Sequence, residues 1–286
     1  MKTYLDCLPC FMNQIVRIGR MLNLSEADCF AMLREFAGQF SELELEDPPP
    51  KTSIRLYDMI SRYTGLEDPF KKIKTESTSK ALELYPELRR RVEAASAPLS
   101  LAAKFAVAGN VIDFAVASEF DLNAEIDRVV ESGTFGKWLE DDFFVALASA
   151  DWLLYLGDNT GETVMDRLFI ETIVKETATP VTYVVREKPI INDAVLADAE
   201  AAGIDKCAKI ISSGCRAPGT VLELCSPEFL ELFHRAPLIV SKGQGNFETL
   251  SDVKAPIFFF LKAKCQVVAE HLKVNPGELI LTDSDG

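Results

Sequence analysis

Residues 157–162, with the sequence GDNTGE, combine side chains that metal-assisted chemistry requires. The apolar run LLYL ends directly before them, and a stretch with helical periodicity follows. The adjacent Asp158 and Asn159 offer carboxylate and amide oxygens, which are hard ligands of the kind that suits Mg²⁺ or Mn²⁺. An Asp-Asn pair at a strand end also serves as an ordinary turn or helix cap, so this motif alone leaves both interpretations open.

Three further polar segments follow predicted strands. REKPIIND comes after TYVV, SGCRAPGT comes after KIIS, and KGQGNFE comes after LIVS. Because the site of an open α/β sheet lies at the carboxyl ends of its strands, we expect the four segments to converge at one edge. Besides Asp158 and Asn159, the candidate residues in them are Arg186, Asp193, Gly214, Lys242, Gly243, Gly245 and Asn246.

These residue types favour chemistry on a phosphoryl group. Asp158, Asn159 and Asp193 would hold a divalent metal, and Lys242 and Arg186 would add positive charge beside it. The glycines of these segments allow backbone N–H groups to approach an anion closely. No serine or cysteine stands in an obvious nucleophile motif with a histidine partner, so a metal-activated water is the simpler nucleophile.

The elements that position these residues are predicted from residue 98 onward. Apolar strand-like runs alternate there with amphipathic helical stretches, which favours a Rossmann-like three-layer α/β/α domain with a mostly parallel sheet over residues 98–286. Residues 1–97 show helical periodicity without a β-rich run and predict a separate helical domain. Within this helical domain, Ser25 is a plausible helix N-cap and Gly65 a helix end. In the α/β domain, KGQGN at 242–246 is predicted to be a glycine loop.

Composition excludes several classes of protein. The formal charge is 30 − 44 = −14, so the chain lacks the basic footprint of a nucleic-acid-binding protein. No stretch of about 18 apolar residues predicts a membrane span. Seven cysteines without a secretion signal indicate a reducing, cytoplasmic compartment. The two histidines exclude a multi-histidine metal site. The sequence is compatible with a homo-oligomer but does not define one.

The chain resembles the DUF89 proteins, the damage-control phosphatases of the ARMT-like group. The matching segments are GDNTGE at 157–162, IND at 191–193, SSGCRAPGT at 212–220 and KGQGNFE at 242–248. AGNVIDF at 108–114 and CLPCF at 7–11 resemble the short prokaryotic-type subfamily with an N-terminal CxxC. The similarity spans nearly the whole chain, and GDNTGE together with KGQGNFE is a specific pair.

The resemblance implies a metal-dependent phosphatase (a phosphomonoester hydrolase) of small phosphometabolites, such as sugar phosphates or nucleotide-related phosphomonoesters, active in metabolite damage control. It implies Mn²⁺, Co²⁺, Ni²⁺ or Mg²⁺ held by Asp158, Asn159 and Asp193, and a substrate phosphate near Lys242 and the 242–246 backbone. Asn110, and Asp113 beside it, are expected at the metal or substrate on the same ground. The chain departs from the family pattern at Arg216, where an acidic residue is expected.

Several alternatives stay open. The fold class also fits a Rossmann-like methyltransferase, although acidic GDNTGE argues against a phosphate or carboxylate of a cofactor resting there. A non-catalytic metal- or phosphometabolite-binding module would contain the same residues. Cys7 and Cys10 are packed thiols, a redox pair, or half of a soft-metal site with Cys265. Either Asp193 or Glu162 could act as general base through a water.

Overall fold

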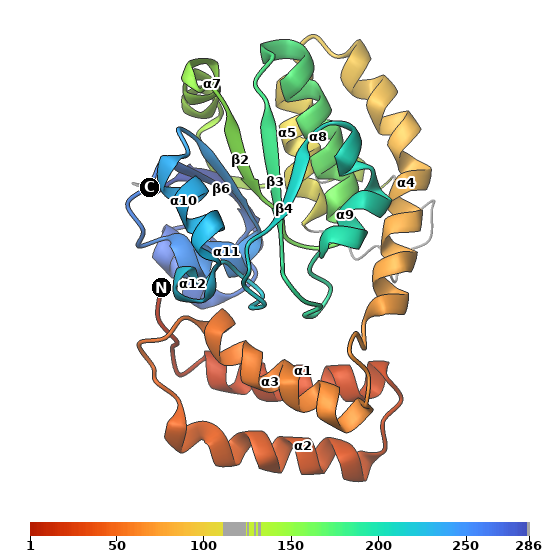
Figure 1. The fold of residues 1–286 in the computed structure, drawn as a ribbon, viewed down its shortest axis with the longest axis vertical. Helices are drawn as coiled ribbons and strands as arrows, with labels where there is room; N and C mark the ends of the chain where they lie inside the picture. The colour runs from red at the N-terminus through yellow and green to blue at the C-terminus, as the bar shows by residue number, and fades with distance from the viewer. Residues whose placement is uncertain (111–123, 125, 129, 131–132, 285–286) are drawn as a thin grey trace.

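A seven-stranded sheet organises the chain in the computed structural model, which describes residues 1–110, 124, 126–128, 130 and 133–284 (Figure 1). The strand order is β1-β7-β6-β5-β2-β3-β4, and all neighbouring strands pair in parallel except β6 and β7. This confirms the predicted α/β class with a mostly parallel sheet. The strands are β1 (Phe135–Trp138), β2 (Leu153–Leu156), β3 (Val181–Val185), β4 (Lys209–Ser212), β5 (Ile239–Lys242), β6 (Ile257–Lys262) and β7 (Leu279–Asp283).

Helices cover both faces of the sheet, so its central strands are buried on both sides. In β2, Leu153 and Tyr155 face one core and Leu154 and Leu156 face the other, as the two-residue period of a strand requires. The described α-helices of this part are α4 (Lys71–Ala94), α5 (Pro98–Gly109), α7 (Glu140–Ser149), α8 (Glu162–Thr177), α9 (Leu196–Ala202), α10 (Pro227–Arg235), α11 (Gly243–Leu250) and α12 (Gln266–Leu272). The described residues also contain short 3-10 helices at Gln39–Glu42, Ile204–Lys206 and Leu222–Leu224.

Helices α1 (Cys7–Met21), α2 (Glu26–Gly38) and α3 (Pro49–Thr64) form a layer across one end of the sheet, which we call the helical layer (Figure 1). Its core is separate from the two sheet cores and takes in Ile190 and Ile191, which follow β3. The carboxyl end of the sheet therefore meets the helical layer. Helix α4 instead contributes to a sheet core, through residues such as Leu88. The domain boundary at residue 97 stays a prediction.

Local signals in the helical layer behave as expected. The Ser25 hydroxyl accepts a hydrogen bond from the backbone N–H of Asp28, which makes it the N-cap of α2. Gly65 ends α3 with a left-handed φ of 67°. No described helix is long and apolar enough to cross a membrane.

Three details differ from the sequence expectation. The predicted glycine loop after β5 is the first turn of α11, which begins at Gly243. Asn110 is the C-cap of α5, and Asp113 falls outside the described residues. Strand β1 and helix α7 were not predicted, because FGKW is short and half polar and pairs only with the distant β7.

Candidate active site

The polar segments meet at the point in the sheet where the order of successive strands changes direction. From β2 the sheet extends through β3 and β4 on one side and through β5 and β6 on the other, so the junction of β2 and β5 is a topological switch point. Leu156 at the end of β2 pairs in register with Ser241 of β5. Asp158, just after β2, and Lys242, the last residue of β5, therefore stand at the ends of neighbouring strands, where ligands bind in open α/β sheets.

The start of α11 approaches Asp158 so closely that only glycine fits there. Gly243 has a φ of 80°, and a Cβ atom at this residue would lie 1.9 Å from Asp158 Oδ2. The first backbone N–H groups of α11 have no partner within the helix, and the positive end of the helix dipole lies beside them. This turn therefore favours negative charge next to Asp158.

The structure brings the three predicted metal ligands together. Asn159 and Asp193 form a β-bridge, and the Ala194 N–H donates to the Asp158 carbonyl over 2.8 Å. Arg186 spans the two carboxylates, with Nε 2.8 Å from Asp193 Oδ2 and Nη2 3.4 Å from Asp158 Oδ1. All but the half-buried Asn159 are buried. Arg186 therefore orients these carboxylates from within the protein.

Glu162 joins this group from the first turn of α8. Its Oε2 accepts from Asn110 Nδ2 over 2.9 Å and from Asn159 Nδ2 over 3.3 Å. Asn110 Nδ2 also lies 3.3 Å from Asp158 Oδ2. The expectation that Asn110 lies at the site agrees with this position, and its role toward metal or substrate stays a prediction.

Lys242 is fully buried behind the ligands. Its Nζ lies 2.6 Å from Glu162 Oε1, 2.5 Å from Asp166 Oδ1 and 2.8 Å from the carbonyl of Ala106. Asp166 is held further by the hydroxyls of Tyr155 and Tyr183, which donate to it over 2.7 and 2.9 Å. Lys242 thus neutralises internal carboxylates in this structure, and its predicted contact with a substrate phosphate is not among its present contacts.

Asp166 was not predicted, and neither were its two tyrosine partners. The signal was present, because Glu162 and Asp166 stand four residues apart on one face of α8. The tyrosines carried no such signal, since a tyrosine in a buried strand usually serves only to pack.

Asn246 connects the strand ends. Its Nδ2 donates to the Gly157 and Lys242 carbonyls, and its Oδ1 accepts from Arg186 Nη1 over 3.1 Å. Thr220, which was not predicted, donates to the same oxygen over 2.8 Å. Asn246 therefore links the chain after β2, β3 and β4 to the start of α11.

The two remaining glycines pack against neighbouring loops. A Cβ at Gly245 would lie 2.0 Å from the Pro218 carbonyl oxygen, so this glycine lets the loop after β4 touch α11. Gly214 packs against Ser226, and its N–H already donates to Ser212 Oγ over 3.0 Å. Contact of either backbone with substrate stays a prediction.

Buried negative charge exceeds buried positive charge in this cluster. Four carboxylates face two cations, so full ionisation leaves 2 − 4 = −2. Burial raises the pKa of Asp158 well above its usual range, and the charges of Asp193 and Glu162 raise it further. Burial also raises the pKa of Asp193, although Arg186 opposes this. We call Asp158, Glu162, Asp166 and Asp193 the carboxylate cluster.

The residues present fit a divalent cation. The donors are hard oxygens, a charge of +2 would balance the carboxylate cluster, and Asn110 Oδ1 and Thr160 Oγ1 are buried without a hydrogen-bond partner in the described chain. Among the described residues, no three His, Cys, Asp or Glu side chains are grouped as a metal site would need. The predicted ligand set contains two carboxylates and one amide, and it stays a prediction.

The N-terminal thiols of Cys7 and Cys10 make no hydrogen bond or ion pair with the carboxylate cluster among the described residues. Burial raises the pKa of Cys7 and Cys10, and the nearby charges of Glu248 and Cys265 raise both further. Cys265 therefore stands near the CxxC, as the sequence suggested. The described residues contain no metal-site grouping here, and the role of the thiols stays a prediction.

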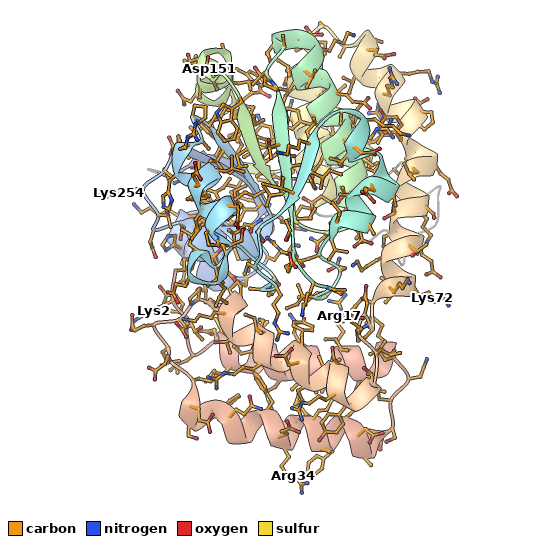
Figure 2. The ribbon with its side chains drawn as sticks, viewed as in Figure 1. Lys2, Arg17, Arg34, Lys72, Asp151 and Lys254 are labelled. Carbon is orange, nitrogen blue, oxygen red and sulfur yellow. The ribbon has the colours of Figure 1, made fainter. Side chains whose placement is uncertain are left out.

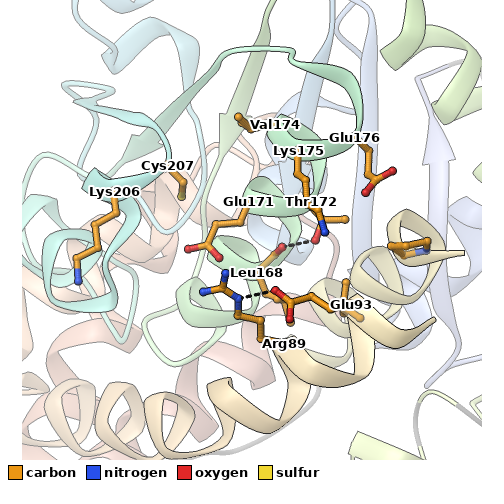
Figure 3. Close-up of a pocket in the computed structure, with 12 residues that line it drawn as sticks. Arg89, Glu93, Leu168, Glu171, Thr172, Val174, Lys175, Glu176, Lys206 and Cys207 are labelled. Atoms are coloured by element: carbon orange, nitrogen blue, oxygen red, sulfur yellow. Dashed lines mark hydrogen bonds and ion pairs between the residues drawn. The ribbon is translucent and has the colours of Figure 1, made fainter. Parts of the chain in front are cut away.

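A cavity of about 360 Å³ lies away from the carboxylate cluster, between α4 and α8 (Figure 3). Arg89, Glu93, Glu171 and Cys207 are among its lining residues. The lining mixes both signs of charge and contains none of the predicted site residues, so it has no evident part in the chemistry above.

Comparisons with known proteins agree with the motifs. The model of the damage-control phosphatase ARMT1-like domain matches residues 3–280. A damage-control phosphatase of Pyrococcus horikoshii is 35% identical over 98% of this chain and 97% of its own. A damage-control phosphatase of Archaeoglobus fulgidus is 32% identical over 80% of each chain.

A solved structure extends the agreement to the whole fold. The crystal structure of a DUF89 family protein from Pyrococcus horikoshii superposes with a TM-score of 0.92, at 34% identity and over 99% of both chains. The chain therefore belongs to the DUF89 family, whose members carry the damage-control phosphatase ARMT1-like domain.

Proposed function

We propose that the protein is a metal-dependent phosphatase that hydrolyses small phosphorylated metabolites in metabolite damage control. The observation that carries the proposal is the charge of −2 in the carboxylate cluster at the switch point of the sheet. Burial of uncompensated charge is costly unless a cation balances it. The names of two relatives as damage-control phosphatases support the reaction class.

Asp158, Asn159 and Asp193 would hold the divalent metal, which we propose to be Mn²⁺, Co²⁺, Ni²⁺ or Mg²⁺. When bound there, such a metal supplies Lewis acidity to a phosphoryl oxygen and lowers the pKa of a water. Arg186 keeps the two carboxylates in place, since it donates to both. The N–H groups at the start of α11 provide an anion-binding turn beside Asp158 for the phosphoryl oxygens.

Lys242 has a supporting part in this proposal. Burial works to lower its pKa, but the charges of Asp166 and Glu162 outweigh burial and raise it, so the ammonium stays charged. It fixes Glu162, whose other oxygen receives the amides of Asn110 and Asn159. Glu162 thereby stays within reach of the ligands and is a candidate general base.

The experiment is phosphate release from a panel of phosphomonoesters, by protein treated with EDTA and then supplied with one of the four metals. Asp158→Asn should lower release on the order of 100-fold, because it replaces a charged carboxylate ligand with a neutral and weaker amide. Asp151→Asn is the matched control: it removes the same charge from an exposed residue just before β2, at the opposite end of the sheet (Figure 2). Metal binding without release from any substrate would favour the non-catalytic binding module.

A further inference from the structure

A second cavity, of about 210 Å³, lies between the helical layer and the carboxyl end of the sheet. One lining residue, Ile190, shares a turn with Asp193 of the carboxylate cluster, since its carbonyl accepts from the Asp193 N–H over 3.1 Å. The residues that line it come from α3, the segment after it, and the loops after β3 and β4: Tyr57, Asp58, Ser61, Glu67, Lys188, Pro189, Ile190 and Arg216. A substrate whose phosphate lies at the carboxylate cluster has this space beside it.

Two cations reach the cavity from adjacent strand ends. Lys188 is exposed and makes no ion pair with any residue that the structure describes. Arg216 donates through Nη2 to Asp58 of α3, and their side chains are 40% and 52% exposed. An ion pair at such exposure contributes about 0–1 kcal/mol, so another anion can replace Asp58 at little cost.

Arg216 also has donors to spare for a second acceptor. A guanidinium carries five N–H groups in a planar fork that matches a carboxylate or phosphate, and Asp58 receives from Nη2 alone. The cavity also presents the carboxylates of Asp58 and Glu67. Its charge is therefore balanced while it is empty of substrate, and an anion that displaces Asp58 meets Arg216 and Lys188.

We propose that Arg216 and Lys188 form a subsite for a second anionic group, a carboxylate or phosphate, on the part of the substrate that leaves after hydrolysis. The proposal rests on the phosphatase function proposed above and specifies its substrate class. Asp58 holds Arg216 in position until the substrate anion arrives, so the helical layer takes part in selecting the substrate.

The test uses matched substrate pairs that differ only in a carboxylate against a CH₂OH group. The short pair is 3-phosphoglycerate and glycerol 3-phosphate, and the long pair is 6-phosphogluconate and sorbitol 6-phosphate. We expect kcat/KM of the unaltered protein to favour the carboxylate member of at least one pair by about 10-fold or more, since charged hydrogen bonds discriminate at that level. Equal values for both members of both pairs would overturn the subsite while leaving the phosphatase intact.

Two variants separate the subsite from a structural ion pair. Arg216→Gln should remove the preference for the carboxylate member and leave the CH₂OH member within about 2-fold, while Arg216→Lys keeps part of the preference. Asp58→Asn breaks the same ion pair but frees Arg216, so the preference should persist or rise. If both variants instead lower kcat/KM equally for both members, the pair only holds α3 in place and the subsite is refuted.

Lys188→Gln should weaken the preference in the same direction as Arg216→Gln, and Lys206→Gln, at an exposed lysine of the cavity between α4 and α8, should leave it unchanged. An equal loss of preference in the Lys206 variant would mean that net charge, and not the subsite, selects the substrate. Absence of metal-dependent release from every pair member would overturn the phosphatase function and the subsite with it.

Discussion

Asp158→Asn should change the thermal stability of the protein in a direction that depends on metal. When fully ionised, the carboxylate cluster carries two negative charges more than its cations balance, and Asp158 lies beside the start of α11. Asparagine keeps the shape of the side chain but removes one of the excess charges. The metal-free variant should therefore be at least as stable as the unaltered protein at pH 8.

The magnitude with metal follows from mass action. A metal at 100 times its Kd stabilises the folded state by about 2.7 kcal/mol. A chain of this size gains roughly 2–4 °C in Tm per kcal/mol, so metal should raise the Tm by about 5–10 °C. Asp158→Asn replaces a charged ligand with a neutral amide and should abolish most of this increase.

The pH dependence of stability independently predicts that Asp158→Asn stabilises the metal-free protein at high pH. The folded-state pKa of Asp158 is raised, so its contribution to stability is most favourable below the ordinary pKa of an aspartate and is lost as pH rises through the raised value. In metal-free protein the variant should therefore gain on the unaltered protein between pH 5 and pH 8.

The assay is thermal unfolding followed by circular dichroism, at pH 5 and pH 8, in EDTA and in Mn²⁺. Asp151→Asn serves as the control, since it changes net charge equally at an exposed residue. A metal-free Asp158→Asn protein that is less stable than the unaltered one at pH 8 would refute the charge argument. An unaltered protein whose Tm does not rise in Mn²⁺ would refute the metal site.

Two further predictions concern α11. Gly243→Ala should lower the Tm, because a left-handed φ costs a residue other than glycine about 1–2 kcal/mol. It should also weaken Mn²⁺ binding in a calorimetric titration, because the new Cβ would displace Asp158. Unchanged Mn²⁺ binding would contradict the close approach of α11 to the ligands. Burial raises the pKa of Glu248 to about 7, and Gln244 and other neighbours oppose this only in part. The destabilisation from Glu248 is absent below its ordinary pKa, grows as pH rises toward 7 and is largely complete by pH 8. Glu248→Gln should therefore stabilise the protein by about 1–2 kcal/mol at pH 8, after allowance for solvent at this half-buried side chain, and not at pH 4. Urea unfolding at the two pH values checks this, and an equal effect at both would contradict it.

The edge of the sheet that carries the site was predictable because strand burial and glycine-rich strand ends are local signals. Asp158 and Asn159 stand just after β2, and Asp193 ends the loop segment that follows β3. Neighbouring parallel strands bring such segments to the same edge of the sheet. The β1–β7 pair was not predictable in the same way, because its two strands are far apart in the chain and only their pairing identifies β1 as a strand.

The glycines at the start of α11 were predicted to lie at the site, but their local structure was predicted wrongly as a loop. Glycines disfavour helix by up to about 1 kcal/mol each, so two of them in five residues predicted a loop. The structure needs glycine at both positions for contact: Gly243 against Asp158 and Gly245 against the Pro218 carbonyl. Such contacts arise only in the folded chain, where packing outweighs propensity.

The sequence could not decide which cation faces the substrate, because Lys242 and Arg186 follow strands as Lys188 and Arg216 do. Lys242 and Arg186 are buried, and each ties two carboxylates together. Their charge is committed to holding the site in shape before any substrate binds. Lys188 and Arg216 keep accessible charge at the cavity beside it. Substitution of the buried Lys242 or Arg186 should therefore reduce activity toward every substrate. Substitution of the accessible Lys188 or Arg216 should change only which substrate is preferred.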